Sequence, residues 1–208
     1  KNPVIIAGNG VHVAGAYDEL CSLAETLGAA VATTYKGKSA IAETHPLAIG
    51  MVGVFGQDAA NTIVGNADAI FVVGAKLTPQ DTVRERPSVF NPNRQKIIQV
   101  DIDPHNAGWT FPIDCALVGD ARAVLNQVIS SCRETLREDP LDVQHRSQTL
   151  SEIKLRHSYY DHVDLHVDSV PSTPQRVVRV IQESLDPDTL IALDAGNNRV
   201  WMSHFYQA

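Results

Sequence analysis

The chain has 208 residues, with 17 Lys and Arg against 24 Asp and Glu, so its formal net charge is −7 when histidine is neutral. This acidic balance argues against a nucleic-acid partner, because phosphate contacts need Lys and Arg gathered on one surface. The composition, 44% hydrophobic and 20% charged, is that of an ordinary globular protein, and no apolar run approaches the roughly 20 residues of a membrane span. We therefore expect a soluble cytoplasmic protein without a nucleic-acid or membrane partner.

The beginning of the sequence and its three cysteines fit the same expectation. Residues 1–4 lack the apolar stretch of a signal peptide. Cys21, Cys115 and Cys132 are odd in number and have no metal-binding spacing, so neither a zinc site nor a disulfide framework is predicted. Each cysteine lies within an apolar pattern, which favours the role of a small hydrophobic residue over that of a reactive thiol.

Short apolar runs bounded by Gly, Pro or Asp alternate with longer segments of helical period along residues 1–132. This alternation is typical of a parallel sheet covered by helices on both faces. It predicts an α/β fold with a doubly wound, mainly parallel six-stranded sheet of the Rossmann-like type. In chain order, the expected strands lie at residues 4–7, 30–33, 70–74, 97–102 and 116–118, and the expected helices at residues 16–27, 59–67 and 121–132.

The composition changes after Cys132, where a charged stretch leads to Pro140. We place the end of the first domain, a nucleotide-binding-like unit, at residue 137. Residues 138–170 then form a connecting segment, with one expected helix at residues 147–160.

Residues 171–208 hold the beginning of a second α/β unit. Its expected elements are a helix with four apolar residues facing inward, a strand at residues 190–193 and a helical start at residues 200–202. The four inward residues are Val177, Val178, Ile181 and Leu185. Because so short a stretch cannot easily hold a core by itself, we predict a truncated domain that is mobile or covers its apolar face with another copy of the chain. A homo-oligomer is therefore the expected assembly.

Ligands of an open parallel sheet bind beyond the carboxyl ends of its strands. Four stretches stand at such ends, and all of them contain glycine or polar residues. Gly8 and Gly10 would let backbone N–H groups approach a phosphate, or they simply form a tight turn, since Val13 takes the place of the third glycine of the dinucleotide fingerprint. The candidate nucleotide-binding residues in the four stretches are Gly8, Asn9, Gly10, Thr34, Tyr35, Lys36, Gly74, Lys76, Asp101 and Asp103.

The acidic residues among these candidates separate two classes of nucleotide protein. A nicotinamide dehydrogenase would need a carboxylate after the second strand, where residues 33–35 read Thr-Thr-Tyr, so that class is disfavoured. Asp101 and Asp103 follow a later strand, where a carboxylate either accepts a ribose hydroxyl or caps a turn before Pro104. Motifs of a P-loop, a nucleophile elbow or a zinc-binding helix are missing from the sequence, so no catalytic residue and no metal ligand is assigned.

Two further patterns have alternative interpretations. In an extended strand, His162, Asp164, His166 and Asp168 would share one face. Such a face could bind a divalent ion, but it is more ordinarily the wet side of an edge strand. An aromatic pair at helical spacing, Trp201 and Phe205, indicates packing rather than a stacking platform.

Six motifs follow one another in residues 1–132, and together they resemble the central domain of thiamine-diphosphate-dependent enzymes, particularly the acetolactate synthase and pyruvate oxidase group. Each motif alone is weak, whereas six in this order and at this spacing are specific. They occupy residues 2–10, 33–38, 45–53, 67–76, 98–104 and 118–121.

The end of the chain is similar to the start of the same family's cofactor-binding domain. Residues 173–175 open a helix, and residues 193–201 read Leu-Asp-Ala-Gly-Asn-Asn-Arg-Val-Trp. The resemblance implies that Gly196, Asn197 and Asn198 help to hold thiamine diphosphate, which is bound with Mg²⁺ in the parent enzyme. It also implies that the catalytic glutamate belongs to an amino-terminal domain and the Gly-Asp-Gly metal motif to a downstream segment. We therefore expect this fragment to be inert, and a parent enzyme that decarboxylates or ligates a small 2-oxo acid.

The resemblance leaves the ligand of the central domain open, since relatives bind FAD, an adenine nucleotide or nothing there. Flavin-binding members commonly have histidine in the loop that here spans residues 52–56 and includes Gly53, another candidate cofactor-binding residue. They also have arginine and acidic residues where this chain has residues 76–79. Both departures disfavour FAD. The alternative function is a stand-alone nucleotide-binding module without catalysis.

Overall fold

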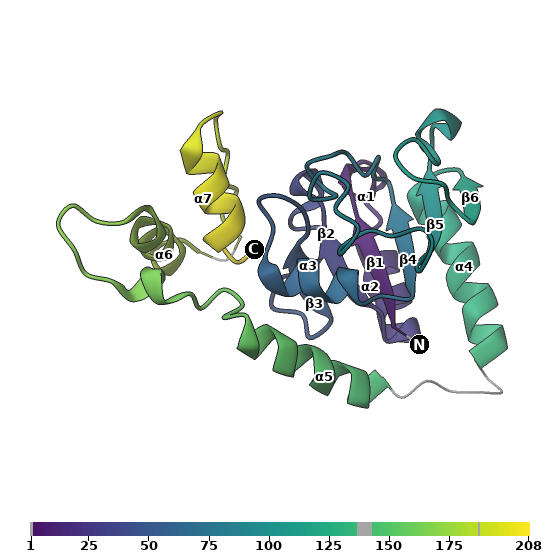
Figure 1. The fold of residues 1–208 in the computed structure, drawn as a ribbon, viewed down its shortest axis with the longest axis horizontal. Coiled ribbons are helices and arrows are strands. Elements are labelled where there is room, and N and C mark those ends of the chain that lie inside the picture. Colours follow the sequence, from purple (N-terminus) through teal and green to yellow (C-terminus); the bar gives the residue numbers. More distant parts are fainter. Residues whose placement is uncertain (1, 137–142, 187) are drawn as a thin grey trace.

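A computed structural model of the protein describes residues 2–136, 143–186 and 188–208. Six strands form one sheet in the order β3-β2-β1-β4-β5-β6 (Figure 1). The strands are β1 (Pro3–Ala7), β2 (Ala30–Thr33), β3 (Ala48–Met51), β4 (Ala69–Val73), β5 (Lys96–Asp101) and β6 (Cys115–Val118). Every neighbouring pair runs parallel, which confirms the predicted α/β fold with a six-stranded Rossmann-like sheet.

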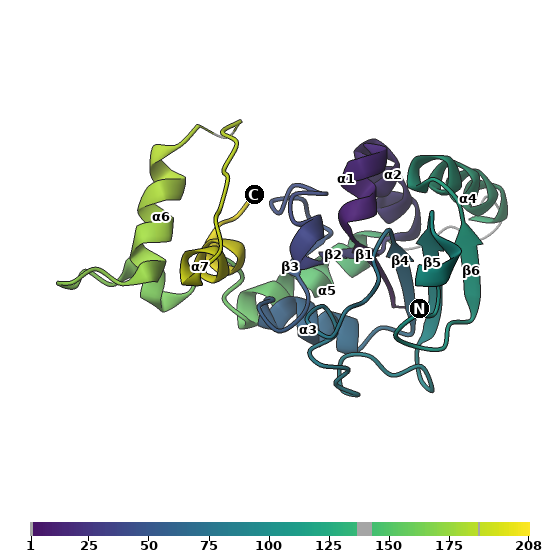
Figure 2. The ribbon, with the colours of Figure 1, turned by 90° about the horizontal axis from the view of Figure 1, so that it is seen from above.

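Helices cover both faces of the sheet (Figure 2). One face carries α1 (Asn9–Ala14), α2 (Tyr17–Leu27) and α4 (Ala121–Leu136), and the other carries α3 (Asp58–Gly65) and α5 (Val143–Arg156). Two more helices, α6 (Pro174–Ser184) and α7 (Asn197–Phe205), lie beyond the β3 edge. Short 3₁₀ turns are η1 (Tyr35–Gly37), η2 (Pro104–Asn106) and η3 (Val163–His166). Within the described ranges, no helix has the length and apolar character needed to cross a bilayer.

The central strands and their helices form because both faces of the sheet are buried. The apolar residues of β1 are almost fully buried, as expected for a parallel strand covered on both sides. On α2, Leu20 and Leu23 face the core, and Gly28 ends the helix in the left-handed region with φ 55°. Leu125 on α4 is also fully buried, and α4 packs along α2. These helices hold the sheet as a rigid platform for its loops.

Some element bounds differ from the sequence-based expectation. The pattern predicted six strands without locating β3, because Ala48–Met51 is short and contains Gly50 at φ 81°. The helix expected at residues 147–160 lies at Val143–Arg156 instead. The proposed domain end at residue 137 and the first residues of the connecting segment lie outside the described residues.

The predicted strand at residues 190–193 is wrong, because this segment has no regular secondary structure and Leu190 is 98% exposed. A strand needs a partner for its backbone groups, and none of the described segments pairs with this one. Val178 on α6 is buried, whereas Val177 and Leu185, the residue after the helix, are exposed and not inward as expected. A small second core holds Leu165, Val178, Met202 and Phe205, with Trp201 packed beside it. This confirms the packing role of Trp201 and Phe205.

The histidine-rich stretch does not form the extended strand that would align its polar residues on one face. It forms η3, because His162 Nδ1 accepts from the Asp164 N–H and competes with strand pairing. His166 Nε2 lies 2.7 Å from Asp161 Oδ1. Among the described residues, no set of three or more His, Cys, Asp or Glu is placed to hold a metal ion.

The three cysteines are free thiols with different surroundings. Cys21 and Cys132 are half-buried against the main core, and burial raises the pKa of both thiols. Cys115 is exposed on β6, which corrects the prediction that all three behave as hydrophobic core residues.

Candidate functional site

A cavity of about 720 Å³ lies beyond the carboxyl ends of the strands. At the centre of the sheet, the chain leaves β1 toward β2 and leaves β4 toward β5, so the loops diverge and open a crevice between them. The residues lining the cavity, which we call the cleft, are Asn9, Gly10, Thr34, Tyr35, Lys36, Gly74, Ala75, Lys76, Thr78, Pro79, Gln80, Asp81, Asp101 and Asn106. Most of the predicted nucleotide-binding residues are thus brought together.

The backbones that follow β1 and β4 cross at van der Waals distance below the cleft. A Cβ at Gly8 would lie 2.3 Å from Gly74 O, and a Cβ at Gly74 would lie 2.5 Å from Gly10 Cα. The N–H of Gly8 donates to Val73 O at 2.8 Å, and the N–H of Gly10 donates to Gly74 O at 3.0 Å. These two N–H groups therefore already donate to backbone carbonyls at the end of β4. Close packing explains the glycines without a phosphate, and Gly8 is not among the cleft-lining residues.

Asp101 ends β5 and is buried at the base of the cleft. Its Oδ1 accepts from the Asp103 N–H and from Asn106 Nδ2, both at 3.0 Å. These two bonds fix the orientation of the carboxylate. Oδ2 accepts no hydrogen bond from the described residues, so it is the oxygen that can accept one from a ligand.

Asp103, the second acidic candidate, lies outside the cleft lining. Its Oδ1 accepts from the His105 N–H at 3.0 Å and lies 2.9 Å from His105 Nδ1. These hydrogen bonds hold the pKa of the Asp103 carboxyl below its ordinary value. Of the two roles left open by the sequence, the observed one for Asp103 is the capping of η2.

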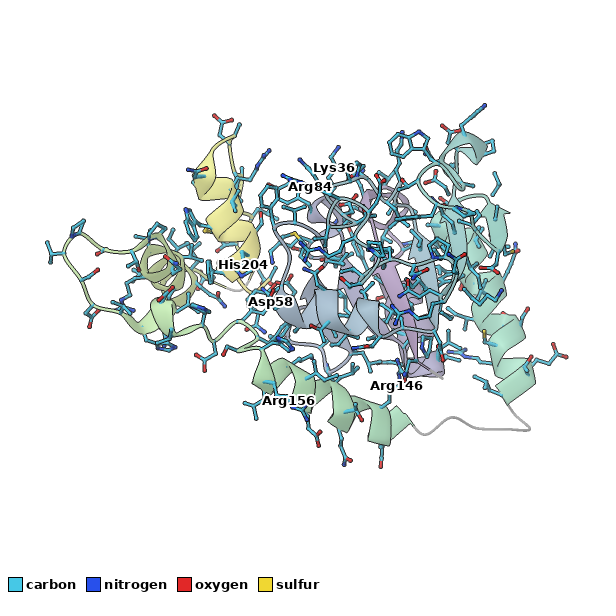
Figure 3. All side chains as sticks on the ribbon, in the orientation of Figure 1. Lys36, Asp58, Arg84, Arg146, Arg156 and His204 are labelled. Atoms are coloured by element: carbon cyan, nitrogen blue, oxygen red, sulfur yellow. The ribbon has the colours of Figure 1, made fainter. Side chains whose placement is uncertain are left out.

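The polar walls of the cleft come from two loops. Thr34 caps η1 by accepting from the Gly37 N–H at 3.1 Å, and this turn presents Tyr35 and Lys36. Lys36 is exposed at the carboxyl end of the sheet (Figure 3). On the opposite wall, Asp81 accepts from the N–H and hydroxyl of Thr78, and Lys76 is exposed. The two walls therefore offer one lysine ammonium each, Lys36 and Lys76, in a cleft that also holds the buried Asp101 carboxylate.

Sequence reasoning missed Thr78, Gln80, Asp81 and Asn106 as cleft residues. The segment between β4 and β5 folds back over the strand ends, and its position depends on contacts between distant residues. Asn106 had a weak signal, because it follows the Asp-Ile-Asp-Pro run by two residues.

Other candidates lie away from the cleft lining. Gly53 has φ 116°, and a Cβ there would lie 2.3 Å from Gln80 O, so it supports the loop behind the cleft. Gly196, Asn197 and Asn198 lie at the start of α7, beyond the β3 edge.

Comparisons with known proteins give the family. A family model described as "Thiamine pyrophosphate enzyme, central domain" matches residues 1–128. Probable acetolactate synthase large subunits of Methanococcus aeolicus and Methanocaldococcus jannaschii are 34% and 36% identical, over 216 and 214 residues, and each alignment covers 100% of this chain. A sulfoacetaldehyde acetyltransferase of Roseovarius nubinhibens is 30% identical over 213 residues, covering 95% of this chain. The alignments cover 35%, 34% and 35% of these relatives, so the chain spans about a third of their length. The chain therefore belongs to the thiamine pyrophosphate enzymes, and residues 1–128 match the central domain of that family.

Proposed function

We propose that the chain is part of a thiamine-diphosphate-dependent enzyme that acts on a small 2-oxo acid by decarboxylation or carboligation, in the manner of an acetolactate synthase. The family match and two relatives named as probable acetolactate synthase large subunits support this activity. Thiamine diphosphate, when bound with Mg²⁺, supplies the electron sink that lets a 2-oxo acid lose carbon dioxide.

The start of α7 fits the diphosphate part of this cofactor. Its first N–H groups have no side-chain cap, and Asn197 and Asn198 are exposed. Gly196 has φ 147°, a backbone conformation that L side chains rarely adopt, so the position favours glycine. Backbone N–H groups and carboxamides donate hydrogen bonds to phosphate oxygens. We therefore assign Gly196, Asn197 and Asn198 to the diphosphate, and residues 171–208 to the start of the cofactor-binding domain.

The apolar residues of this last segment support a larger assembly. Val170, Val177 and Leu190 are exposed, and the second core is small. A surface of this kind is buried either by other parts of the enzyme or by a second copy of the chain. We propose a homo-oligomeric cytoplasmic enzyme, and sedimentation of the full-length protein tests the assembly.

The activity is tested by comparing this chain with the full-length enzyme. With thiamine diphosphate, Mg²⁺ and pyruvate, we expect carbon dioxide release from the full-length enzyme and none above the protein-free rate from residues 1–208. Release by residues 1–208 would show that the chain is catalytically complete. If the full-length enzyme releases no carbon dioxide from pyruvate or other 2-oxo acids, the proposed activity is contradicted.

We further propose that the cleft binds an adenine nucleotide. The observation that favours it is Asp101, whose Oδ1 is fixed by two donors while Oδ2 is left as an acceptor in a cleft with two lysines. A carboxylate acceptor suits a ribose hydroxyl and repels a phosphate, so we place the ribose at Asp101 and the phosphates toward Lys36 and Lys76. FAD is the less favoured ligand, because residues 52–56 lack the histidine, and residues 76–79 lack the arginine and acidic residues, that are common in flavin-binding members.

Calorimetric titration of ADP and FAD tests this site, with Asp103→Ala as the matched control for Asp101→Ala. Both variants remove a carboxylate from the carboxyl end of β5 or the residues just after it, but Asp103 lies outside the cleft lining and caps η2. We expect ADP to bind the unaltered protein and Asp103→Ala, and to lose binding in Asp101→Ala. If neither ADP nor FAD gives a heat of binding, the cleft is only a structural scaffold. If ADP binds this chain but the full-length protein does not turn over 2-oxo acids, a stand-alone nucleotide-binding module is favoured.

A further inference from the structure

A second polar cluster lies at the far end of the segment that forms one wall of the cleft. After η1 the chain reaches Lys38, whose ammonium lies 2.7 Å from both carboxylate oxygens of Glu43. Glu43 is only 1% exposed. Lys38 also donates to the Tyr160 hydroxyl at 3.1 Å, so the connecting segment covers the ion pair.

Residues from the end of the chain complete the cluster around Glu43. The Ala208 N–H donates to Glu43 Oε2 at 2.7 Å, and the Tyr159 hydroxyl donates to Glu43 O at 3.1 Å. Nearby, Gln57 Nε2 donates to His204 O at 2.5 Å, and the His204 ring donates to Phe55 O at 3.1 Å. Figure 3 shows His204 of α7 next to the start of α3. Thus loops after β2 and β3, the connecting segment and α7 all meet here.

The electrostatics make these contacts mutually dependent. Burial lowers the pKa of the Lys38 ammonium, and the Glu43 carboxylate opposes that effect. Burial, and then the charge of Glu43, raises the pKa of the Tyr160 hydroxyl well above its ordinary value. A buried ion pair needs its partners in good geometry, because losing one partner leaves an uncompensated charge. The pair is therefore favourable only while Tyr160 and the residues after α7 remain in place.

We propose that the Lys38–Glu43 pair is a latch that fixes α7 to the central sheet unit. A buried ion pair contributes little net stability but penalises alternative arrangements, which suits an element that sets orientation. The latch thereby holds the loop before α7 at a defined position beside the β3 edge. That this position helps Gly196–Asn198 to bind thiamine diphosphate rests on the proposed function. The latch itself does not rest on it.

Amide hydrogen exchange of the full-length protein tests the latch without any cofactor. In Lys38→Met and in Glu43→Gln, we expect the α7 amides to exchange about tenfold faster or more, while the amides of β1 and β4 keep their protection. Lys38→Arg, which keeps the charge, should preserve most of the α7 protection. Lys96→Met is the matched control, because Lys96 pairs with Asp114 at the same 2.7 Å distance but in an exposed position on β5.

Unchanged α7 exchange in both latch variants would overturn the proposal, and so would an equal rise in Lys96→Met. If Lys38→Met also loses β1 protection, it has failed to fold, and the test passes to Glu43→Gln, which keeps the shape of the side chain. Unchanged α7 exchange in Glu43→Gln then refutes the latch. Because the readout needs no ligand, failure of the latch is distinguishable from failure of cofactor binding or turnover.

Discussion

Replacing Gly74 by alanine tests whether the glycines below the cleft serve backbone packing. Gly74 has φ 59°, and an L-residue in this region costs about 1–2 kcal/mol. The new Cβ would lie 2.5 Å from Gly10 Cα, a backbone atom fixed by the Gly10 N–H bond to Gly74 O. Relieving such a clash costs about 1–3 kcal/mol more. The expected loss of unfolding free energy is therefore about 2–5 kcal/mol, out of about 5–15 kcal/mol for an ordinary domain.

Gly108→Ala separates the cost of the backbone conformation from the cost of the clash. Gly108 also has positive φ, 73°, but a Cβ there would meet nothing closer than 3.6 Å. It should lose only the conformational term of about 1–2 kcal/mol. Urea unfolding followed by far-ultraviolet circular dichroism measures both variants against the unaltered protein. Equal losses would refute the packing argument, because they would mean that the crossing relaxes freely around a methyl group. The requirement for glycine would then have to come from a ligand.

Two further predictions use the same unfolding assay. Leu125→Ala should lower the free energy of unfolding by about 2–5 kcal/mol, since Leu125 is 0% exposed. Leu155→Ala, at an 83% exposed position on α5, should change it by no more than about 0.5 kcal/mol. Equal effects would contradict the assigned core. Burial lowers the pKa of Lys154 from 10.5 to about 8. Between these values the unfolded chain binds the extra proton, so raising the pH favours the folded state. Relative to Lys154→Met, the unaltered protein should therefore gain stability between about pH 8 and about pH 10, and a pH-independent difference would mean that Lys154 is solvated.

The sheet could be predicted because its information is local. Buried parallel strands are continuous apolar runs, and the glycines and Asp101 that end them mark the side on which ligands bind. The same reasoning failed at residues 190–193, where an apolar run has no strand partner among the described residues. It also failed at η3, where a local hydrogen bond from the Asp164 N–H to the His162 ring replaces the extended form.

The rest of the site depends on contacts that no local pattern reveals. Asp81 reaches the cleft only because the segment between β4 and β5 folds back across the strand ends. The Lys38–Glu43 pair is five residues apart in sequence, yet its partners include Tyr160 and Ala208, which lie far along the chain. Charged residues in a loop are ordinarily solvated, so the sequence alone indicates an exposed pair.

The cleft and the latch lie at two ends of one segment, Thr34–Glu43, and the sheet fixes that segment closely. The Thr34 N–H donates to Ala7 O at 2.9 Å, and a Cβ at Gly37 would lie 2.1 Å from the same oxygen. The His12 ring donates to Lys38 O at 3.0 Å, which ties the segment to α1 as well. A segment held by β1 and α1 at successive points cannot act as a loose lid. A ligand contact at Tyr35 and the Lys38–Glu43 pair are therefore built on the same rigid support, and moving either one requires breaking hydrogen bonds to the central strand.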